Sequence, residues 1–484
     1  MSEKLKKSFE LFEDALQKEG LSRRDAIKML AMSGLLATTS SSANTQLNAS
    51  GIKVKIVIVG GGLAGVSTAA RLKAASDALD ITIIEPNANS VSYQAGNTFI
   101  GTGLYEKKDV MYRTQDFIPR DVEFIQDKVM EFFPDNNQVI TKNKQVISYD
   151  FLVVSAGVKL DFSQIKGLEA LGDMYTLEEN EKLIQHLEGS GASTVYNINT
   201  AVQTWKNMQA SIEQAKQGKQ INAVFTHPHT AIKCGGAPKK IMYLMNSRLN
   251  EAGVRKNADL TFYANSGKMF VVKEYEDAII KQYKARNMKW NLKHNLQEID
   301  LQNKVAIFDK FWDEKGAYDE DLEEYEMVTK HEKVEVPYDF LHFTPPMIAA
   351  PEIGNSPIGS SNGWVPVNQK TLQHVKYSNI FALGDIAAVA LGKTGGSVRK
   401  QYKVVAENLL AAIANKELTA EYDGYTVCPI ITDIGKVMLA EFDWSMKPTP
   451  SFPLDPTQER YIWWIMKAYL LKPMTQYGML RGKI

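Results

Sequence analysis

The two cysteines, Cys234 and Cys428, are the residues of this chain best suited to redox chemistry. Cys234 lies between a predicted strand and a predicted helix, with Lys233, Lys239 and Lys240 close to it in the sequence. Because a helix N-terminus and nearby cations both lower the pKa of a thiol, Cys234 is placed to be a thiolate at neutral pH. The two cysteines form a reactive dithiol if the fold brings them together, and are otherwise two unrelated buried thiols.

A second set of residues has the spacing of a dinucleotide site. Gly60, Gly62 and Gly65 form a G-x-G-x-x-G turn, and Glu85 follows 20 residues after Gly65. In such a turn the first glycine allows the tight bend, the second lets the backbone approach a pyrophosphate, and the third lets helix and strand pack closely. The acidic residue accepts a hydrogen bond from a ribose hydroxyl.

The elements around this turn support the assignment. Residues 54–59 are a short apolar run typical of a strand, residues 66–75 are an alanine-rich helix, and residues 81–84 are a second strand. The pyrophosphate is expected at the helix N-terminus. This stretch alone does not decide between NAD and FAD.

A second signature, Gly384-Asp385, identifies the dinucleotide as FAD. It follows a short strand at residues 379–383, so that Asp385 can bind the ribityl hydroxyls. The N-terminus of the next helix is expected at the N1/O2 edge of the flavin, where its positive end stabilises the reduced anionic ring. Gly157, which follows a buried strand at residues 149–154, is expected to pass the phosphates. Lys393 either contacts the flavin or a quinone, or is a solvated loop charge.

The middle of the chain predicts a second doubly wound domain without a second nucleotide site. Strands at residues 222–225 and 258–264 alternate with helices that begin near Lys239 and at Glu274. Where a second glycine fingerprint would bind NAD(P)H, the sequence has His227-Pro228-His229 and then Cys234. We therefore expect an electron donor other than NAD(P)H. The two histidines either shuttle protons or are structural.

Composition limits the partners of the chain. Its 484 residues contain 56 basic and 56 acidic side chains, so no net field favours nucleic acid. No run of 18 apolar residues predicts a membrane-spanning helix. Two cysteines exclude a disulfide framework, and no ligand set indicates a metal.

The N-terminal region has the order of a twin-arginine export signal. Arg23-Arg24 follows a charged segment, and an apolar stretch at residues 29–37 precedes small residues near Ser41 and Ala43. Ala26 stands where an aromatic residue is usual. We expect export, and the alternative is a charged helix with a chance arginine pair.

The C-terminal tail is rich in aromatic residues beside basic ones, between residues 461 and 483. This pattern is typical of helices that lie in the plane of a membrane surface. The alternative is that the apolar face packs on the protein's own core or on a second subunit, in a homo-oligomer.

Four segments together resemble the sulfide:quinone oxidoreductase family, and most of all its branch that includes the mitochondrial enzymes. They are Lys233-Cys234-Gly235-Gly236-Ala237-Pro238-Lys239-Lys240, Leu341-His342-Phe343-Thr344-Pro345-Pro346-Met347, Gly384-Asp385, and Tyr422-Asp423-Gly424-Tyr425-Thr426-Val427-Cys428-Pro429. The resemblance runs from about residue 54 to the end. Two features depart from it: Gly235, where alanine is frequent, and the export leader, which a mitochondrial enzyme lacks.

The resemblance implies an FAD enzyme that oxidises sulfide and reduces a membrane quinone. Sulfide would attack a bridge between the two cysteines at Cys428, and Cys234 would pass the electrons to FAD. Sulfane sulfur would leave to an acceptor or as polysulfide. Because a third cysteine that binds FAD covalently in some branches is missing here, non-covalent FAD is expected.

The sequence thus predicts an α/β protein with two doubly wound domains and C-terminal helices that contact a membrane, on the periplasmic face of the inner membrane. The expected units are residues 1–49 (leader), 50–165 and 361–420 (FAD domain), 166–360 (second domain) and 421–484 (C-terminal region). Two other functions stay open: a flavocytochrome-type sulfide dehydrogenase subunit with a haem partner, and a flavin-binding scaffold without enzymatic activity.

Overall fold

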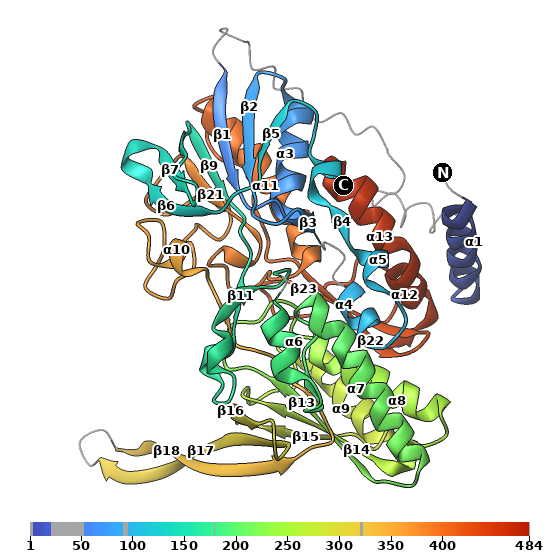
Figure 1. The fold of residues 1–484 in the computed structure, drawn as a ribbon. Coiled ribbons are helices and arrows are strands. Elements are labelled where there is room, and N and C mark those ends of the chain that lie inside the picture. The colour runs from blue at the N-terminus through green and yellow to red at the C-terminus, as the bar shows by residue number, and fades with distance from the viewer. Residues whose placement is uncertain (1–2, 21–52, 91–94, 179, 320–322, 484) are drawn as a thin grey trace. The chain divides into compact units, whose positions relative to one another are not determined.

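The structure is a computed structural model that describes residues 3–20, 53–90, 95–178, 180–319 and 323–483. It divides the chain into two compact units (Figure 1). Unit 1 contains Met1–Gly96, Tyr105–Lys159 and Ile348–Ile484, and unit 2 contains Asn97–Leu104 and Leu160–Met347. The chain therefore changes unit after Lys159, which is 6 residues before the predicted boundary at 165, and after Met347, which is 13 residues before the predicted boundary at 360.

Unit 1 is built on a five-stranded parallel sheet with the order β21-β9-β1-β2-β5. Its strands are mostly apolar on both faces, as expected for parallel strands covered on two sides. Helix α3 (Leu63–Ala75) packs on β1 and β2, and helix α11 (Gly395–Ile413) packs on α3 and β21. The strands are β1 (Val54–Val59), β2 (Leu79–Ile84), β5 (Val122–Ile125), β9 (Phe151–Val154) and β21 (Ile380–Ala382).

The remainder of unit 1 includes an antiparallel sheet of β22 (Thr426–Asp433), β23 (Lys436–Phe442) and β24 (Glu459–Arg460). Helix α12 (Tyr461–Ile465) and the π-helical segment Met466–Leu470 follow, and the N-terminal helix α1 (Glu3–Lys18) packs against both of them.

The C-terminal tail is helical as predicted, but most of its apolar side chains are buried. Ile462, Trp463, Trp464 and Ile465 are all less than 10% exposed, because they pack within unit 1. Three tyrosines of the tail, which are more than 40% exposed, are the exceptions: Tyr461, Tyr469 and Tyr477. Packing on the protein's own core thus accounts for much of the tail. No helix in the described part of the chain has the length and apolar character needed to cross a bilayer.

Unit 2 is also built on a five-stranded parallel sheet, with the order β12-β19-β13-β14-β15. Helices α7 (Ile198–Lys216) and α8 (Ala237–Glu251) pack on β13, and α9 (Lys273–Ala285) follows β14. This confirms the alternation of strand and helix predicted for the middle of the chain. The strands are β12 (Ala192–Ser193), β13 (Ile221–His227), β14 (Ala258–Ala264), β15 (Lys289–Leu292) and β19 (Phe340–His342).

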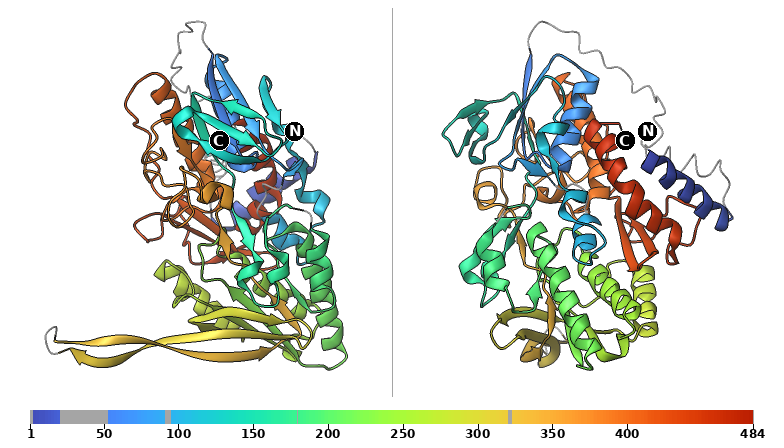
Figure 2. Two further views of the ribbon diagram at one scale, coloured as in Figure 1. Left: turned by 60° about the vertical axis from the view of Figure 1, so that its left-hand side comes forward. Right: turned by 45° about the vertical axis from the view of Figure 1, so that its right-hand side comes forward.

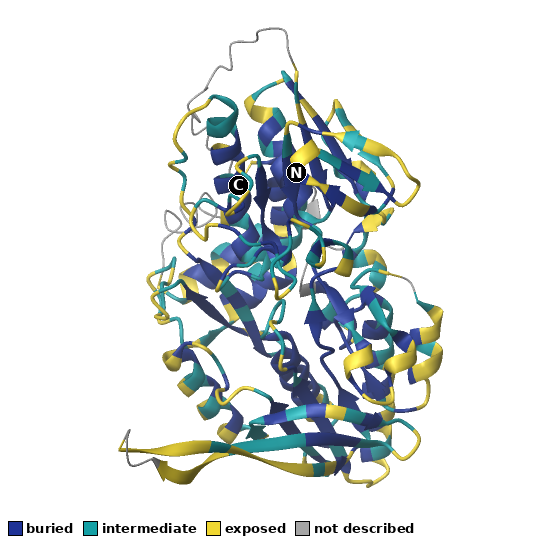
Figure 3. Ribbon diagram, turned by 90° about the vertical axis from the view of Figure 1, so that its left-hand side faces the viewer, coloured by how far each residue is buried: buried dark blue, intermediate teal, exposed yellow. Residues whose placement is uncertain are grey.

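A long antiparallel ribbon in unit 2 is a feature that the sequence analysis did not predict. Strands β17 (Val305–Asp319) and β18 (Glu324–Pro337) pair along their length, whereas β16 (His294–Asp300) pairs only with Val305–Lys310 of β17. Beyond that sheet the described side chains of the ribbon are largely exposed (Figures 2 and 3).

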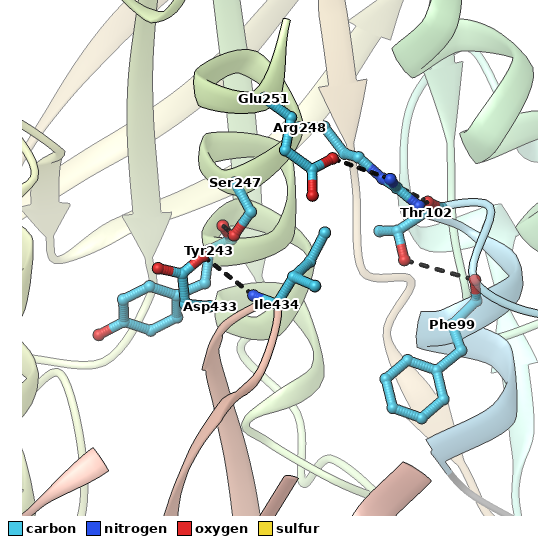
Figure 4. Close-up of polar contacts among 8 residues, drawn as sticks. All are labelled: Phe99, Thr102, Tyr243, Ser247, Arg248, Glu251, Asp433 and Ile434. Atoms are coloured by element: carbon cyan, nitrogen blue, oxygen red, sulfur yellow. Dashed lines mark hydrogen bonds and ion pairs between the residues drawn. The ribbon is translucent and has the colours of Figure 1, made fainter. Parts of the chain in front are cut away.

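The short segment Asn97–Leu104 belongs to unit 2, although the flanking chain belongs to unit 1. Arg248 of α8 fixes it by donating from Nε and Nη2 to the carbonyl oxygen of Thr102, at 3.0 and 2.9 Å (Figure 4). The guanidinium is itself held by Glu251, at 2.9 Å, and stacks over the ring of Trp205.

Candidate active site

The predicted dinucleotide residues meet at one edge of the unit 1 sheet. Gly60 directly follows β1, Glu85 follows β2, and Gly384 comes two residues after β21. Gly157 comes three residues after β9. Because the strands are parallel and adjacent, their carboxyl ends bring these four residues to the same edge, which is where doubly wound sheets bind ligands.

The glycines at this edge of the sheet differ in what a side chain would meet: at two of them it would collide with the protein, and at two it would not. Gly60 has a φ of +108°, and a Cβ there would lie 2.5 Å from the carbonyl oxygen of Ser155. A Cβ at Gly65 would lie 1.9 Å from the carbonyl oxygen of Gly60. These two glycines are therefore required by the protein itself. Around Gly62 and Gly157, in contrast, a Cβ would meet nothing within 4 Å, which leaves room for a ligand to approach the backbone.

Glu85 is oriented by the turn that it faces. Its Oε2 accepts a hydrogen bond from Gly61 N at 2.8 Å, and its Oε1 accepts from Asn87 N at 2.9 Å and Asn87 Nδ2 at 2.7 Å. Burial raises the pKa of the Glu85 carboxyl, and these three donors act in the opposite direction. The carboxyl group is thus fixed beside the glycine turn, where a ribose hydroxyl would bind.

The second signature is held by α11. Gly384 has a φ of +74°, and its N–H donates to the buried side chain of Gln401 at 2.9 Å. Thr394 caps α11 by accepting from Ser397 N at 3.1 Å, so the helix begins at Gly395. Gln401 has no motif of its own in the sequence, and only its position on α11 beneath Gly384 shows its role.

Cys428 lies on β22, which packs on the N-terminal end of α11 in the same unit. The contact is close: a Cβ at Gly396 would lie 2.0 Å from Cγ1 of Val427, and the hydroxyls of Ser397 and Thr426 are 3.5 Å apart. Cys428 is buried. Unit 1 therefore brings this cysteine into the neighbourhood of the helix end that the sequence assigns to the flavin.

Cys234 lies in the turn that joins β13 to α8 in unit 2. Its φ is +82°, a conformation that non-glycine residues rarely adopt and that costs about 1–3 kcal/mol. The turn is fixed from two sides: Tyr196 Oη donates to the carbonyl oxygen of Cys234 at 3.2 Å, and Lys233 N donates to Sδ of Met347 at 3.2 Å. The sequence analysis gave no role to Tyr196 or Met347, which come from the ends of other strands.

One buried cation lies beside the thiol of Cys234, and a second lies on the same helix. Lys240 Nζ lies 3.6 Å from Sγ, although Lys240 is only 2% exposed. Lys239, also buried, places its ammonium 4.5 Å from the ring centre of Phe262. Because α8 begins at Ala237, its N-terminus adds partial positive charge. The charge of Lys240 and the helix N-terminus would both stabilise a thiolate at this position.

Comparisons with known proteins agree with this geometry. The family described as "Pyridine nucleotide-disulphide oxidoreductase" matches residues 54–202. The mitochondrial sulfide:quinone oxidoreductase of Mus musculus is 35% identical over 428 residues, covering 88% of this chain and 86% of that protein. The chain belongs to the sulfide:quinone oxidoreductase family.

Two further relatives extend the comparison. The mitochondrial sulfide:quinone oxidoreductase of Dictyostelium discoideum is 35% identical, covering 89% of this chain and 86% of that protein. The solved structure of the sulfide:quinone oxidoreductase from Aquifex aeolicus shares the fold, with a TM-score of 0.69 at 20% identity, and covers 89% of this chain and 92% of that chain. The resemblance derived from the sequence motifs is therefore confirmed.

Family membership identifies FAD as the cofactor, and the residues at the carboxyl ends of the unit 1 strands, here called the cradle, fit it. The open space at Gly62 and Gly157 and the oriented carboxyl of Glu85 fit a dinucleotide. Gly384 and Asp385, at the carboxyl end of β21, complete the set. The described residues contain no group of three or more His, Cys, Asp or Glu that could hold a metal ion.

Lys393 is engaged with the protein rather than solvated. Its Nζ donates to the carbonyl oxygens of Asp385 and Ala387 and lies 3.9 Å from the ring centre of Trp364. Burial lowers the pKa of Lys393 to about 8. The alternative of a solvated loop charge is thus wrong, and a flavin or quinone contact stays a prediction.

The two predicted histidines differ. His229 is exposed, whereas His227 is partly buried and its Nδ1 lies 3.1 Å from the carbonyl oxygen of Pro228. Burial lowers the pKa of His227 to about 3, so the ring is neutral at physiological pH. A methyl group at Gly235 would lie 3.7 Å from its Nε2, so His227 faces the cysteine turn.

Proposed function

We propose that the chain oxidises sulfide to sulfane sulfur through Cys234, Cys428 and FAD, and reduces a quinone. The observation that carries the proposal is Cys234, in a turn of unusual backbone conformation beside Lys240, at the position where a related domain would bind a nicotinamide nucleotide. The names of the relatives add the substrates, sulfide and quinone. None of these names indicates the haem partner that the flavocytochrome alternative requires.

The proposed chemistry begins from a bridge between the two cysteines. Hydrosulfide attacks Sγ of Cys428, which becomes a persulfide, and the electron pair of the broken S–S bond leaves on Cys234 as a thiolate. Lys240 stabilises this thiolate by its charge at 3.6 Å. FAD, held non-covalently by the cradle of unit 1, supplies the two-electron relay to quinone. The sulfane sulfur then leaves to a thiol acceptor or as polysulfide.

The decisive experiment is rapid mixing of the purified holoenzyme with sulfide, followed by a soluble quinone. Sulfide is expected to bleach the flavin absorbance and quinone to restore it. NADH is expected to leave the flavin oxidised. Bleaching by NADH without any response to sulfide would contradict the proposal.

Membrane contact through the C-terminal helices is part of the proposal, since a membrane quinone is reached from the bilayer. Its support is the exposed tyrosines of the tail with Lys472 and Arg481 beside them. Replacement of Tyr461, Tyr469 and Tyr477 by serine, which leaves the buried part of the tail in place, is expected to release the protein from vesicles, and undiminished sedimentation would assign these side chains another role.

Export to the periplasmic face is a separate proposal, which rests on the sequence alone. Arg23-Arg24 and the apolar stretch lie outside the described residues, and the names of three relatives place them in mitochondria. A fusion of residues 1–50 to a reporter, expressed with and without a twin-arginine translocase, tests it. Equal export in both strains, or none, would remove it.

A further inference from the structure

Helix α1 has a narrow apolar face that is fully used in packing. Phe12, Ala15 and Leu16 are 2%, 5% and 1% exposed, and Ser8, one turn before Phe12, is buried with them. Leu11 borders this side of the helix and is 38% exposed, whereas Gln17 lies on the opposite side and is exposed. The spacing i, i+4, i+7, i+8 places the four buried residues on one side of an α-helix. The helix therefore lies on unit 1 with a defined face.

The surface that α1 covers belongs to the C-terminal helices. It contacts α12 and the segment Met466–Leu470, and Glu19, just after the helix, forms an ion pair with Arg460 at the start of α12. Two views show α1 beside these elements (Figures 1 and 2). The same elements carry the exposed Tyr461 and Tyr469. The face is thus shared between an apolar part under α1 and an aromatic rim in water.

We propose that α1 is a displaceable cover of this face and that a membrane surface replaces it when the protein docks. The inference rests on the proposed delivery of electrons to a membrane quinone. A bilayer interface offers what α1 now offers, an apolar layer bordered by polar groups. The tyrosines at the rim have the amphipathic character that favours the headgroup level. In water, α1 protects the apolar part of the face and keeps the protein in solution.

The first test replaces the packed side chains. In Phe12→Glu/Leu16→Glu, two buried contacts of α1 are lost, so the face opens more often. The vesicle-bound fraction, measured by sedimentation with vesicles of phosphatidylcholine and phosphatidylglycerol, is expected to rise several-fold above that of the unmodified chain. The matched control is Gln17→Glu, which adds a charge to the exposed side of the same helix. It is expected to bind vesicles like the unmodified chain.

Two results of this experiment would refute the cover. If α1 itself anchors the protein, the double variant binds vesicles less than the unmodified chain does, and the cover is refuted. Unchanged binding of a double variant that retains its FAD also refutes it.

A second variant breaks the ion pair, whose side chains are 20% and 23% exposed. Its binding is measured with vesicles of phosphatidylcholine alone, so that the added positive charge does not itself attract the vesicle. Glu19→Arg places like charges at the Arg460 contact and is expected to raise vesicle binding, and the exchanged pair Glu19→Arg/Arg460→Glu is expected to restore it. Binding that does not respond to the first change refutes the cover. Flavin bleaching by sulfide, recorded on the same samples, reports on the proposed function separately, because it does not depend on vesicles.

Discussion

The two parallel sheets of this chain carry the same strand, turn and helix, but their turns use different atoms. In unit 1 the turn between β1 and α3 consists of glycines, and it presents backbone N–H groups with open space at Gly62. In unit 2 the turn between β13 and α8 presents the thiol of Cys234 beside Lys240. The first arrangement suits a bound phosphate, and the second suits a covalent reaction.

The turns also differ in which residue has an unusual backbone conformation. Around the dinucleotide turn of unit 1, positive φ falls on Gly60 and Gly384, for which it costs little, whereas in the turn of unit 2 it falls on Cys234, for which it is costly. The hydrogen bond from Tyr196 and the contact of Lys233 with Met347 hold that conformation. The unfavourable conformation thus occurs at Cys234, the residue whose reactive side chain the turn presents.

The largest expected effect comes from the thiols. Cys234→Ser or Cys428→Ser is expected to lower sulfide-driven quinone reduction at least a hundredfold, because a hydroxyl neither forms the bridge nor leaves as a stable anion. FAD content, measured by absorbance, is expected to stay unchanged. Retained turnover in either variant would remove the dithiol from the mechanism.

The glycine turn separates structure from ligand binding. Gly65→Ala is expected to cost about 2–3 kcal/mol of unfolding free energy, since its Cβ would collide with Gly60 O at 1.9 Å. Gly62→Ala has space for its Cβ and is expected to leave the apoprotein within about 0.5 kcal/mol of the unmodified chain while weakening FAD binding. Denaturant unfolding and flavin titration measure the two effects. Equal loss of stability would contradict this division.

The charge beside the thiol gives a smaller effect. Lys240→Met is expected to slow alkylation of Cys234 by iodoacetamide at pH 7 about tenfold, because the thiolate loses its nearby cation. Lys281→Met, on the exposed side of α9, serves as the control. An unchanged alkylation rate would show that the helix N-terminus alone activates the thiol.

One substitution at Cys234 is expected to raise stability instead of lowering it. Cys234→Gly relieves the positive φ and is expected to raise the free energy of unfolding of the apoprotein by about 1 kcal/mol, although activity is lost. Cys234→Ser keeps the unfavourable conformation and provides the reference. Lower stability of the glycine variant would show that the conformation is not strained.

A further expected effect concerns pH. The pKa of Lys393 is lowered to about 8 in the folded protein, against 10.5 as its ordinary value. Between these values the unfolded chain binds the extra proton, so stability rises with pH; below pH 8 the cost of burying the charge is fully present. The melting temperature of the apoprotein, relative to that of the Lys393→Met apoprotein, is expected to rise from pH 8 to pH 10.5. A constant difference would contradict the shift.

The sequence was most informative where chemistry constrains the backbone. Gly60, Gly65 and Glu85 predicted the turn because a short motif needs each of them at one spacing. Strand β1 was found at its observed bounds, because the four residues from Ile56 to Val59 are buried and continuously apolar. The β17–β18 ribbon was missed, since its exposed side chains give no apolar alternation.

Contacts between distant segments could not be derived from the sequence. Hydrogen bonds and ring contacts that no local pattern encodes involve Gln401 and Trp364 near the flavin signature of unit 1, and Tyr196 at the cysteine turn of unit 2. The burial of the C-terminal aromatic residues has the same cause. Their composition fits a membrane surface and a protein core equally well, and only the packing of α1 and unit 1 shows which side chains are covered.

The interrupted layout of the two units has a consequence for the order of folding. Nearly all of unit 2 is one continuous stretch, Leu160–Met347, whereas unit 1 is assembled from three stretches, of which the last ends at the C-terminus. During synthesis, unit 2 can therefore collapse first from contacts within its own stretch. The flavin cradle needs β21 and Gly384, which emerge later, so the cysteine turn is formed before the cofactor can be bound.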